Sequence, residues 1–191
     1  MSQLDREKWN QRYRGGAYSG RLHPCAFLEA WIDEIPVGRA IDVACGAGRN
    51  ALYLARRGFD VDAVDISGEA LDRAREVAQI SNLKLNWLEH DLDERLELDA
   101  GYQLILIVRY VNLPLIRQLA ANLAPGGFLI CEQHLVTEAE VVGPGNPSFR
   151  VRPGDLLAAA EGLRVRHLEE SLVQEPDGQT AALARLVAQR Y

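Results

Sequence analysis

The sequence predicts an α/β fold, a doubly wound sheet of seven strands that is mostly parallel with an antiparallel C-terminal hairpin strand. Segments with helical periodicity alternate with short apolar runs, which is typical of a parallel sheet covered on both faces. A glycine-rich turn at 46–48 joins the first apolar run to a helical segment. Two strand-like segments, 163–173 and 180–190, flank Glu-Pro-Asp-Gly at 175–178, which predicts a hairpin.

The individual elements follow from local periodicity and from capping residues. Gly58 is placed to end the helix after the glycine turn, and Ser67 to begin the next helix. Pro153 and Asp155 predict a helix start with proline at the first position, and Gly162 would close that helix. The expected helices are 3–13, 24–34, 49–57, 68–79, 113–123 and one that starts near 152. The expected strands are 39–44, 59–65, 83–89, 102–108, one fed by the sharp turn within 124–132, and the C-terminal pair.

The composition indicates one globular domain. With 191 residues, 48% of them hydrophobic, the chain is large enough to bury a single core. We expect one domain over 1–191, with an N-terminal helical lid at 1–35 and a core at 36–191. No apolar run approaches the ~20 residues of a membrane span, and the first residues are charged rather than signal-like. We therefore expect a cytoplasmic protein with no membrane partner.

Charge and cysteine content argue against two classes of function. A net charge of −6 is poorly suited to a phosphate backbone, so no nucleic-acid partner is expected. The three cysteines Cys25, Cys45 and Cys131 have no Cys-x-x-Cys spacing, and the four histidines are scattered. Neither a disulfide framework nor a metal site is therefore expected.

The segment 40–55 is the most informative part of the chain. It reads as an apolar strand carrying Asp42, the turn Gly46-Ala-Gly48, and an amphipathic helix. Glycines let the backbone approach a ligand closely, and the following helix offers free N–H groups, so an adenine-bearing cofactor is expected there. Because Ala51 completes a loose Gly-x-Gly-x-x-Ala pattern, a nicotinamide dinucleotide stays open as an alternative.

Three features together resemble the class I S-adenosylmethionine-dependent methyltransferases. They are Asp42 four residues before Gly46, the acid Asp65 at the end of the second strand, and the turn Leu-Ala-Pro-Gly-Gly-Phe-Leu at 123–129. The resemblance implies a Rossmann-like sheet with a reversed seventh strand, which matches the predicted hairpin. Trp-Asn-Gln-Arg-Tyr at 9–13 and the segment 146–157 further resemble small bacterial enzymes of the tellurite-resistance and thiopurine type.

The resemblance implies S-adenosyl-L-methionine as cofactor and gives roles to several residues. Asp42 would order the glycine loop and the methionine end. Asp65, which lies 23 residues later and should emerge at the carboxyl edge of the sheet, would accept from the ribose hydroxyls. Asp91 would accept from the adenine amino group, with the Leu92 N–H at the ring. The implied cofactor residues are Trp9, Tyr13, Asp42, Ala44, Gly46, Gly48, Asn50, Asp65, Ile66, Asp91, Leu92 and Val108.

The expected acceptor residues follow the fourth and fifth strands, so they leave the same edge of the sheet. Arg109 could hold an anionic substrate, and Tyr110 and His134 could orient or deprotonate a nucleophile, with Arg150 and Arg152 in reach. The expected reaction is in-line methyl transfer to a small molecule, with thiols and chalcogen oxyanions among the candidates, by a monomer or homodimer. An NAD(P)-dependent oxidoreductase and a non-catalytic cofactor-binding module remain as alternatives.

Overall fold

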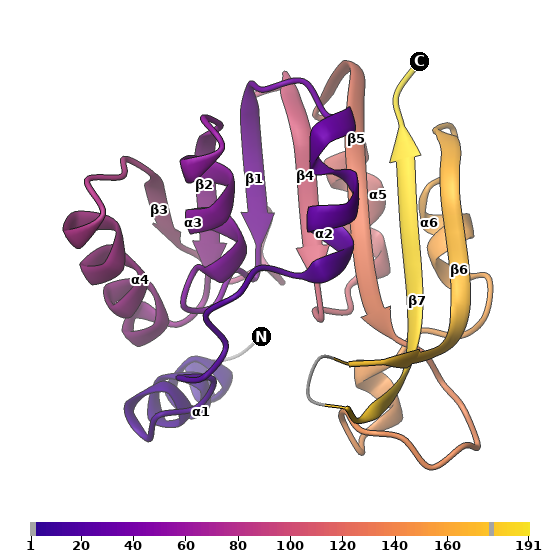
Figure 1. Cartoon of the computed structure of the whole chain (residues 1–191), viewed down its shortest axis with the longest axis horizontal. Helices are drawn as coiled ribbons and strands as arrows, with labels where there is room; N and C mark the ends of the chain where they lie inside the picture. The colour runs from indigo at the N-terminus through magenta and orange to yellow at the C-terminus, as the bar shows by residue number, and fades with distance from the viewer. Residues whose placement is uncertain (1–2, 176–177) are drawn as a thin grey trace.

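A single seven-stranded sheet forms the centre of the molecule (Figure 1). The computed structural model describes residues 3–175 and 178–191. The strand order is β3-β2-β1-β4-β5-β7-β6, and β7 is antiparallel to both of its neighbours. The predicted fold class is confirmed. The strands are β1 Arg39–Val43, β2 Asp60–Asp65, β3 Asn86–Glu89, β4 Tyr102–Val108, β5 Leu123–His134, β6 Arg164–Gln174 and β7 Thr180–Gln189.

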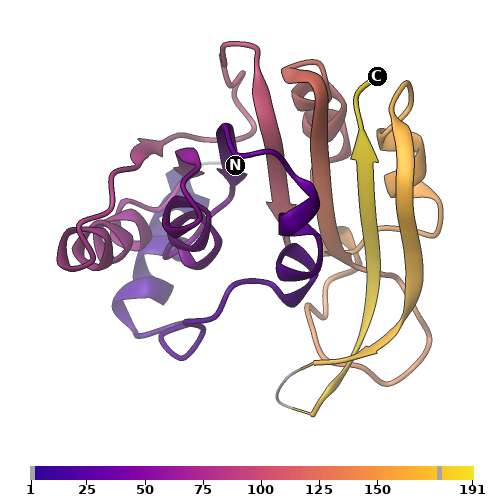
Figure 2. The ribbon, with the colours of Figure 1, turned by 45° about the horizontal axis from the view of Figure 1, so that its top comes forward.

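Helices cover both faces of this sheet (Figures 1 and 2). On one face, α2 and α3 bury Leu28 and Leu54 against β1 and β4, and on the other face α5 and α6 bury Ile116 and Leu156. The central strand β4 is covered on both sides and is apolar apart from Gln103 near its start. The helices are α1 Gln3–Arg14, α2 Ala26–Trp31, α3 Arg49–Arg56, α4 Gly68–Ile80, α5 Leu113–Ala120 and α6 Asp155–Ala159, with 3-10 turns η1 Ile32–Glu34 and η2 Pro147–Phe149.

The N-terminal helices take two different places. Helix α1 lies at the carboxyl edge of the sheet, beside the start of α4 (Figure 1). Helix α2 instead packs on the face of the sheet, where Phe27, Leu28 and Ile32 are buried. The segment 1–35 was expected as a lid. Within it, α1 is the part that lies at the carboxyl edge of the sheet. Among the described residues, no helix combines the length and apolar character needed to cross a membrane.

Several element boundaries differ from the prediction. Strand β3 begins at Asn86, three residues later than expected, and α5 ends at Ala120 rather than at 123. Helix α6 begins at Asp155, because Gly154 adopts a left-handed φ of 83° and serves as its N-cap. Asp155 Oδ2 accepts from the Arg152 N–H at 2.7 Å, which closes a turn that keeps Pro153 outside the helix. The prediction of proline at the first helical position is therefore wrong.

Candidate functional site

The glycine loop turns the chain from β1 into α3 at the carboxyl edge of the sheet. Ala44, Gly46 and Gly48 all have left-handed φ values, of 57°, 56° and 76°. A Cβ atom at Gly46 would lie 2.4 Å from the Tyr13 hydroxyl, and one at Gly48 would lie 2.9 Å from the Ala74 Cβ. Both glycines are therefore required by close packing as well as by backbone geometry.

Asp42 lies beneath this loop and fixes the first turn of α3. Its side chain is buried, and Oδ2 accepts from the Ala51 N–H at 3.0 Å. Burial raises the pKa of Asp42 to about 7, although the Ala51 N–H and the Arg49 guanidinium oppose this shift. The carboxyl group thus satisfies one of the free N–H groups at the start of the helix.

Asp65 ends β2 beside the glycine loop, as the spacing predicted. Its Oδ2 accepts from the Gly46 N–H at 2.7 Å and its Oδ1 from the Ser67 N–H at 2.9 Å. Burial raises the pKa of Asp65, while these two N–H groups favour the ionised form. Because each carboxylate oxygen can accept more than one hydrogen bond, both oxygens keep capacity for a ligand.

The residues after β3 lie at the same edge. The His90 N–H donates to the Asp65 carbonyl at 3.0 Å, which ties the two strand ends together. Asp91 accepts from the Asp93 N–H at 3.0 Å, and Asp91 and Leu92 are both buried. Ile66, between Asp65 and the helix cap Ser67, is also buried. The residues expected to meet ribose and adenine therefore follow neighbouring strands at one edge.

Helix α1 is fastened to this edge by polar contacts. Asn10 Oδ1 accepts from the Ser67 hydroxyl at 2.7 Å, and Arg14 forms an ion pair with Glu69 at 2.8 Å. Arg73 from α4 donates to the carbonyls of Tyr13 and Ala17, at the end of the helix. The sequence reasoning gave no role to Asn10, although it lies in the segment 9–13 quoted for the resemblance, and no role to Arg73, which lies in no motif.

Tyr13 is the residue of α1 that reaches the glycine loop. It is buried, and its hydroxyl is the atom that approaches Gly46. Burial and then the nearby Asp65 carboxylate raise the pKa of Tyr13 above its usual value. Trp9 lies against the Tyr13 ring, with centroids 6.3 Å apart, and the Arg12 guanidinium covers Trp9. Of the expected aromatic pair, Tyr13 reaches the loop, and Trp9 packs on Tyr13.

Two predicted cofactor residues contact the interior of the fold. The Asn50 Oδ1 accepts from the Cys25 N–H at 2.8 Å and thereby fixes the start of α2. Val108, the last residue of β4, packs into the core on the same face as α2 and α3. The structure thus shows a hydrogen bond for Asn50 and a packing contact for Val108.

Arg109 is the centre of a charged cluster where β4, β5 and β6 end. It has a left-handed φ of 60°, and its N–H donates to the Glu132 carbonyl at 2.8 Å. Its guanidinium pairs with Glu132 at 2.9 Å and with Glu175 at 2.6 Å, and lies 3.0 Å from a ring nitrogen of His134. The structure therefore brings Arg109 and His134 together, as their positions after adjacent strands predicted.

Glu132 is a buried carboxylate shared by two arginines. Arg185 on β7 donates to its Oε2 at 2.8 Å, while Arg109 and the Cys25 thiol occupy Oε1. Burial opposes ionisation of Glu132, but the two guanidinium groups outweigh it and lower its pKa. The sequence reasoning assigned no role to Glu132, Arg185 or Glu175. Charged residues within the apolar strands β5 and β7 were the available signal.

His134 is an uncharged imidazole at neutral pH. Burial, Arg109 and Arg150 together lower its pKa to about 4. Gly143 packs against the ring, because a Cβ there would lie 2.7 Å from two ring atoms. Arg150 is anchored by the carbonyls of Pro144 and Leu135, both at 2.9 Å. Arg152, in contrast, is exposed.

Tyr110, one of the expected acceptor residues, lies close enough to two of the expected cofactor residues for their charges to affect it. Burial raises its pKa, and the carboxylates of Asp91 and Asp65 add to that shift. The phenol is therefore within electrostatic range of both acids. Tyr110 also packs against the core on the side of α5 and α6.

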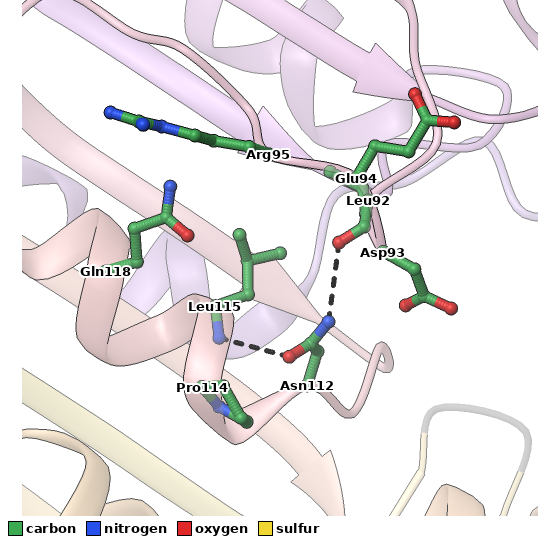
Figure 3. Close-up of a pocket in the computed structure, with 8 residues that line it drawn as sticks. All are labelled: Leu92, Asp93, Glu94, Arg95, Asn112, Pro114, Leu115 and Gln118. Atoms are coloured by element: carbon green, nitrogen blue, oxygen red, sulfur yellow. Dashed lines mark hydrogen bonds between the residues drawn. The ribbon is translucent and has the colours of Figure 1, made fainter.

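A cavity of about 490 Å³ opens between α5 and the segment after β3 (Figure 3). Asn112 spans its mouth, donating to the Leu92 carbonyl at 3.4 Å and accepting from the Leu115 N–H at 3.0 Å. The cavity adjoins Leu92 but includes none of the glycine-loop residues. Within 3–175 and 178–191, no group of three or more His, Cys, Asp or Glu side chains is arranged to hold a metal ion.

Comparisons with known proteins agree with this geometry. A methyltransferase domain family matches residues 40–127, from β1 through the turn into β5. The ubiquinone biosynthesis O-methyltransferase of Rickettsia akari is 33% identical over 72 residues, which cover 38% of this chain and 28% of that protein. A putative methyltransferase of Bacillus subtilis, YqeM, is 32% identical over 81 residues, covering 42% and 32%. The chain thus spans about a third of the length of these relatives.

Solved structures share the fold over most of the chain. TehB from Haemophilus influenzae superposes with a TM-score of 0.75 at 20% identity, covering 87% of this chain and 62% of TehB. A structure described as the conversion of a disulfide bond into a thioacetal group during echinomycin biosynthesis superposes with a TM-score of 0.73 at 17% identity, covering 97% and 91%. A methyltransferase domain family thus matches residues 40–127, and the chain shares the fold of these solved structures.

Proposed function

We propose that this protein transfers the methyl group of S-adenosylmethionine to a small-molecule acceptor at the carboxyl edge of its sheet. The observation that carries the proposal is the contact between Asp65 and the glycine loop. The carboxylate that closes β2 bonds to the Gly46 N–H at 2.7 Å, which fixes an acid beside a backbone cradle. Cofactors bind at this edge in open α/β sheets.

The residues present fit the cofactor chemically. Gly46 and Gly48 let the loop pass close to Tyr13 and Ala74, and Asp65 holds a carboxylate beside the Gly46 N–H. In the proposal, Asp65 accepts from the ribose hydroxyls, Asp91 from the adenine amino group, and the Leu92 N–H meets the ring. Asp42 supports the loop at the methionine end, and Trp9 and Tyr13 exclude water from above.

The sulfonium group of the cofactor supplies an already activated methyl, so the protein's own contribution is alignment and exclusion of water. Arg109, Tyr110 and His134 orient the acceptor for in-line displacement, with no covalent enzyme intermediate. Alignment of this kind is worth several kcal/mol, on the order of 7–11 in the best cases. With its pKa lowered to about 4, His134 is a weak base at neutral pH. This favours acceptors that ionise by themselves, such as thiols and chalcogen oxyanions.

The remaining expectations are part of the same proposal. A net charge of −6 supports a small molecule rather than a nucleic acid as partner. A cytoplasmic location, no membrane partner, and a monomer or homodimer are the further parts of the proposal. The family match favours S-adenosylmethionine over a nicotinamide cofactor.

Calorimetric titration with S-adenosylhomocysteine, with NADH as the control ligand, tests the proposal. We expect micromolar affinity for the first and no binding of the second. Asp65→Ala should weaken S-adenosylhomocysteine binding by about 1–3 kcal/mol, because charge-assisted hydrogen bonds are lost. Unchanged affinity in this variant would remove Asp65 from the ribose role. Cofactor binding without turnover of thiols or oxyanions in a broad screen would support a non-catalytic module instead.

A further inference from the structure

Arg109 is held by two carboxylates that differ in how deeply they lie. The Glu132 side chain is 3% exposed and the Glu175 side chain is 26% exposed. Glu132 belongs to the central part of the sheet, whereas Glu175 follows β6 at the hairpin. One carboxylate is thus a permanent part of the interior, and the other reaches Arg109 from the rim.

The buried carboxylate does not neutralise the cluster by itself. Glu132 shares its charge between Arg109 and Arg185, each within 3 Å, and Arg185 also pairs with Glu169 at 3.5 Å. Arg150 and Arg21 also lie close enough to contribute to the lowered pKa of His134. Arg150 forms no ion pair with any residue in the described part of the chain. Three arginines, Arg109, Arg150 and Arg21, therefore act on His134, and Glu175 is the carboxylate that pairs with Arg109 from the rim.

We propose that Glu175 occupies the position on the Arg109 guanidinium that a carboxylate of the acceptor takes when the acceptor binds. The acceptor is a small carboxylic acid whose carboxylate replaces Glu175 on the guanidinium of Arg109. This inference rests on the proposed function, because it names the chemical class of the molecule that receives the methyl group. The carboxylate binds the acceptor to Arg109, and a separate atom of the acceptor, such as a thiol sulfur, receives the methyl group.

The geometry of Arg109 supports a planar carboxylate as this ligand. A guanidinium matches carboxylates through parallel N–H donors, and Nη2 meets the Glu175 Oε1 at 2.6 Å while Nη1 faces His134. The uncharged imidazole of His134 does not compete for the anion. A tethered carboxylate such as Glu175 acts at an effective concentration on the order of millimolar, so a free acid must overcome that competition.

The test is titration of benzoate into the protein saturated with S-adenosylhomocysteine, with neutral benzamide as the matched ligand. We expect Glu175→Gln to bind benzoate about tenfold more tightly than the unaltered protein, because the internal competitor is lost. Glu175→Asp keeps the charge but shortens the side chain, so a smaller gain is expected. Glu161→Gln, the same charge change at an exposed position, should leave benzoate affinity unchanged.

Three outcomes would overturn the inference. Equal benzoate affinity in the unaltered protein and in both Glu175 variants would show that Glu175 competes with nothing. An equal gain in Glu161→Gln would assign the effect to overall charge. An equal gain for benzamide or sulfate would remove the preference for a planar carboxylate. The affinity for S-adenosylhomocysteine, measured in the same proteins, reports separately on the proposed function.

Discussion

Replacing Gly46 by alanine tests whether α1 rests on the glycine loop. The φ of Gly46 is 56°, and a left-handed backbone costs a non-glycine residue about 1–2 kcal/mol. The new Cβ would also lie 2.4 Å from the Tyr13 hydroxyl but 3.5 Å from the ring carbon that bears it. Moving the buried phenol, whose helix end is held by Arg73, should add about 1 kcal/mol. We therefore expect Gly46→Ala to lower the free energy of unfolding by about 2–3 kcal/mol.

The contribution of the hydroxyl can be isolated with Tyr13→Phe. Without the hydroxyl the close contact disappears and the backbone cost of about 1–2 kcal/mol stays, so the two changes should couple by about 1 kcal/mol. Gly48→Ala is the matched control, because its Cβ would meet Ala74 and Trp87 and not Tyr13. Its cost should be equal in the two backgrounds.

Equilibrium unfolding in urea, with coincident fluorescence and circular dichroism, measures all of these free energies. A coupling between the Gly46 and Tyr13 changes below about 0.3 kcal/mol would refute the reasoning. In that case Tyr13 would not lie on the loop, and α1 would not be the cover of the site.

Two further predictions concern pH. The pKa of Asp42 in the folded state, about 7, lies above its value in the unfolded chain, so the free energy of unfolding falls as pH rises from about 4 through 7. Asp42→Asn should remove this part of the pH dependence. Urea unfolding at pH 5 and pH 8 should show a fall about 2 kcal/mol larger in the unaltered protein than in the variant, and equal falls would contradict the burial of a protonated Asp42. His134 has the opposite effect. Its pKa in the folded state, about 4, lies below the value near 6.5 in the unfolded chain, so the free energy of unfolding falls as pH drops from about 6.5 to 4, and His134→Gln should remove this dependence. Between pH 7 and 5 the free energy of unfolding should fall about 1 kcal/mol less in the variant than in the unaltered protein, a figure reduced for the partial exposure of the ring. Parallel plots of this free energy against pH would mean that His134 does not resist protonation.

The sequence was sufficient for the parts of the fold that depend on local signals. Alternating apolar segments and the glycine turn predicted the sheet and its reversed strand, and Ser67 was correctly predicted as a helix cap, since its hydroxyl accepts from the Ala70 N–H. The start of α6 was wrong because Gly154, with its positive φ, outweighs the usual preference for proline at the first helical position. The cofactor edge was also predictable, because parallel strands place their carboxyl ends together.

The charged cluster was not predictable in the same way, because its members come from distant parts of the chain. Arg109, Glu132, Glu175 and Arg185 meet only when β7 inserts between β5 and β6, and no spacing in the sequence encodes that insertion. Glu132 and Arg185 differ from surface charges only in standing within apolar strands, and that signal does not say which partners they meet. The pairing also changes what His134 can do, since a histidine of ordinary pKa would suit a general base and one lowered to about 4 does not. The topology of the sheet, rather than any local motif, therefore determines which charges surround His134 and how they shift its pKa.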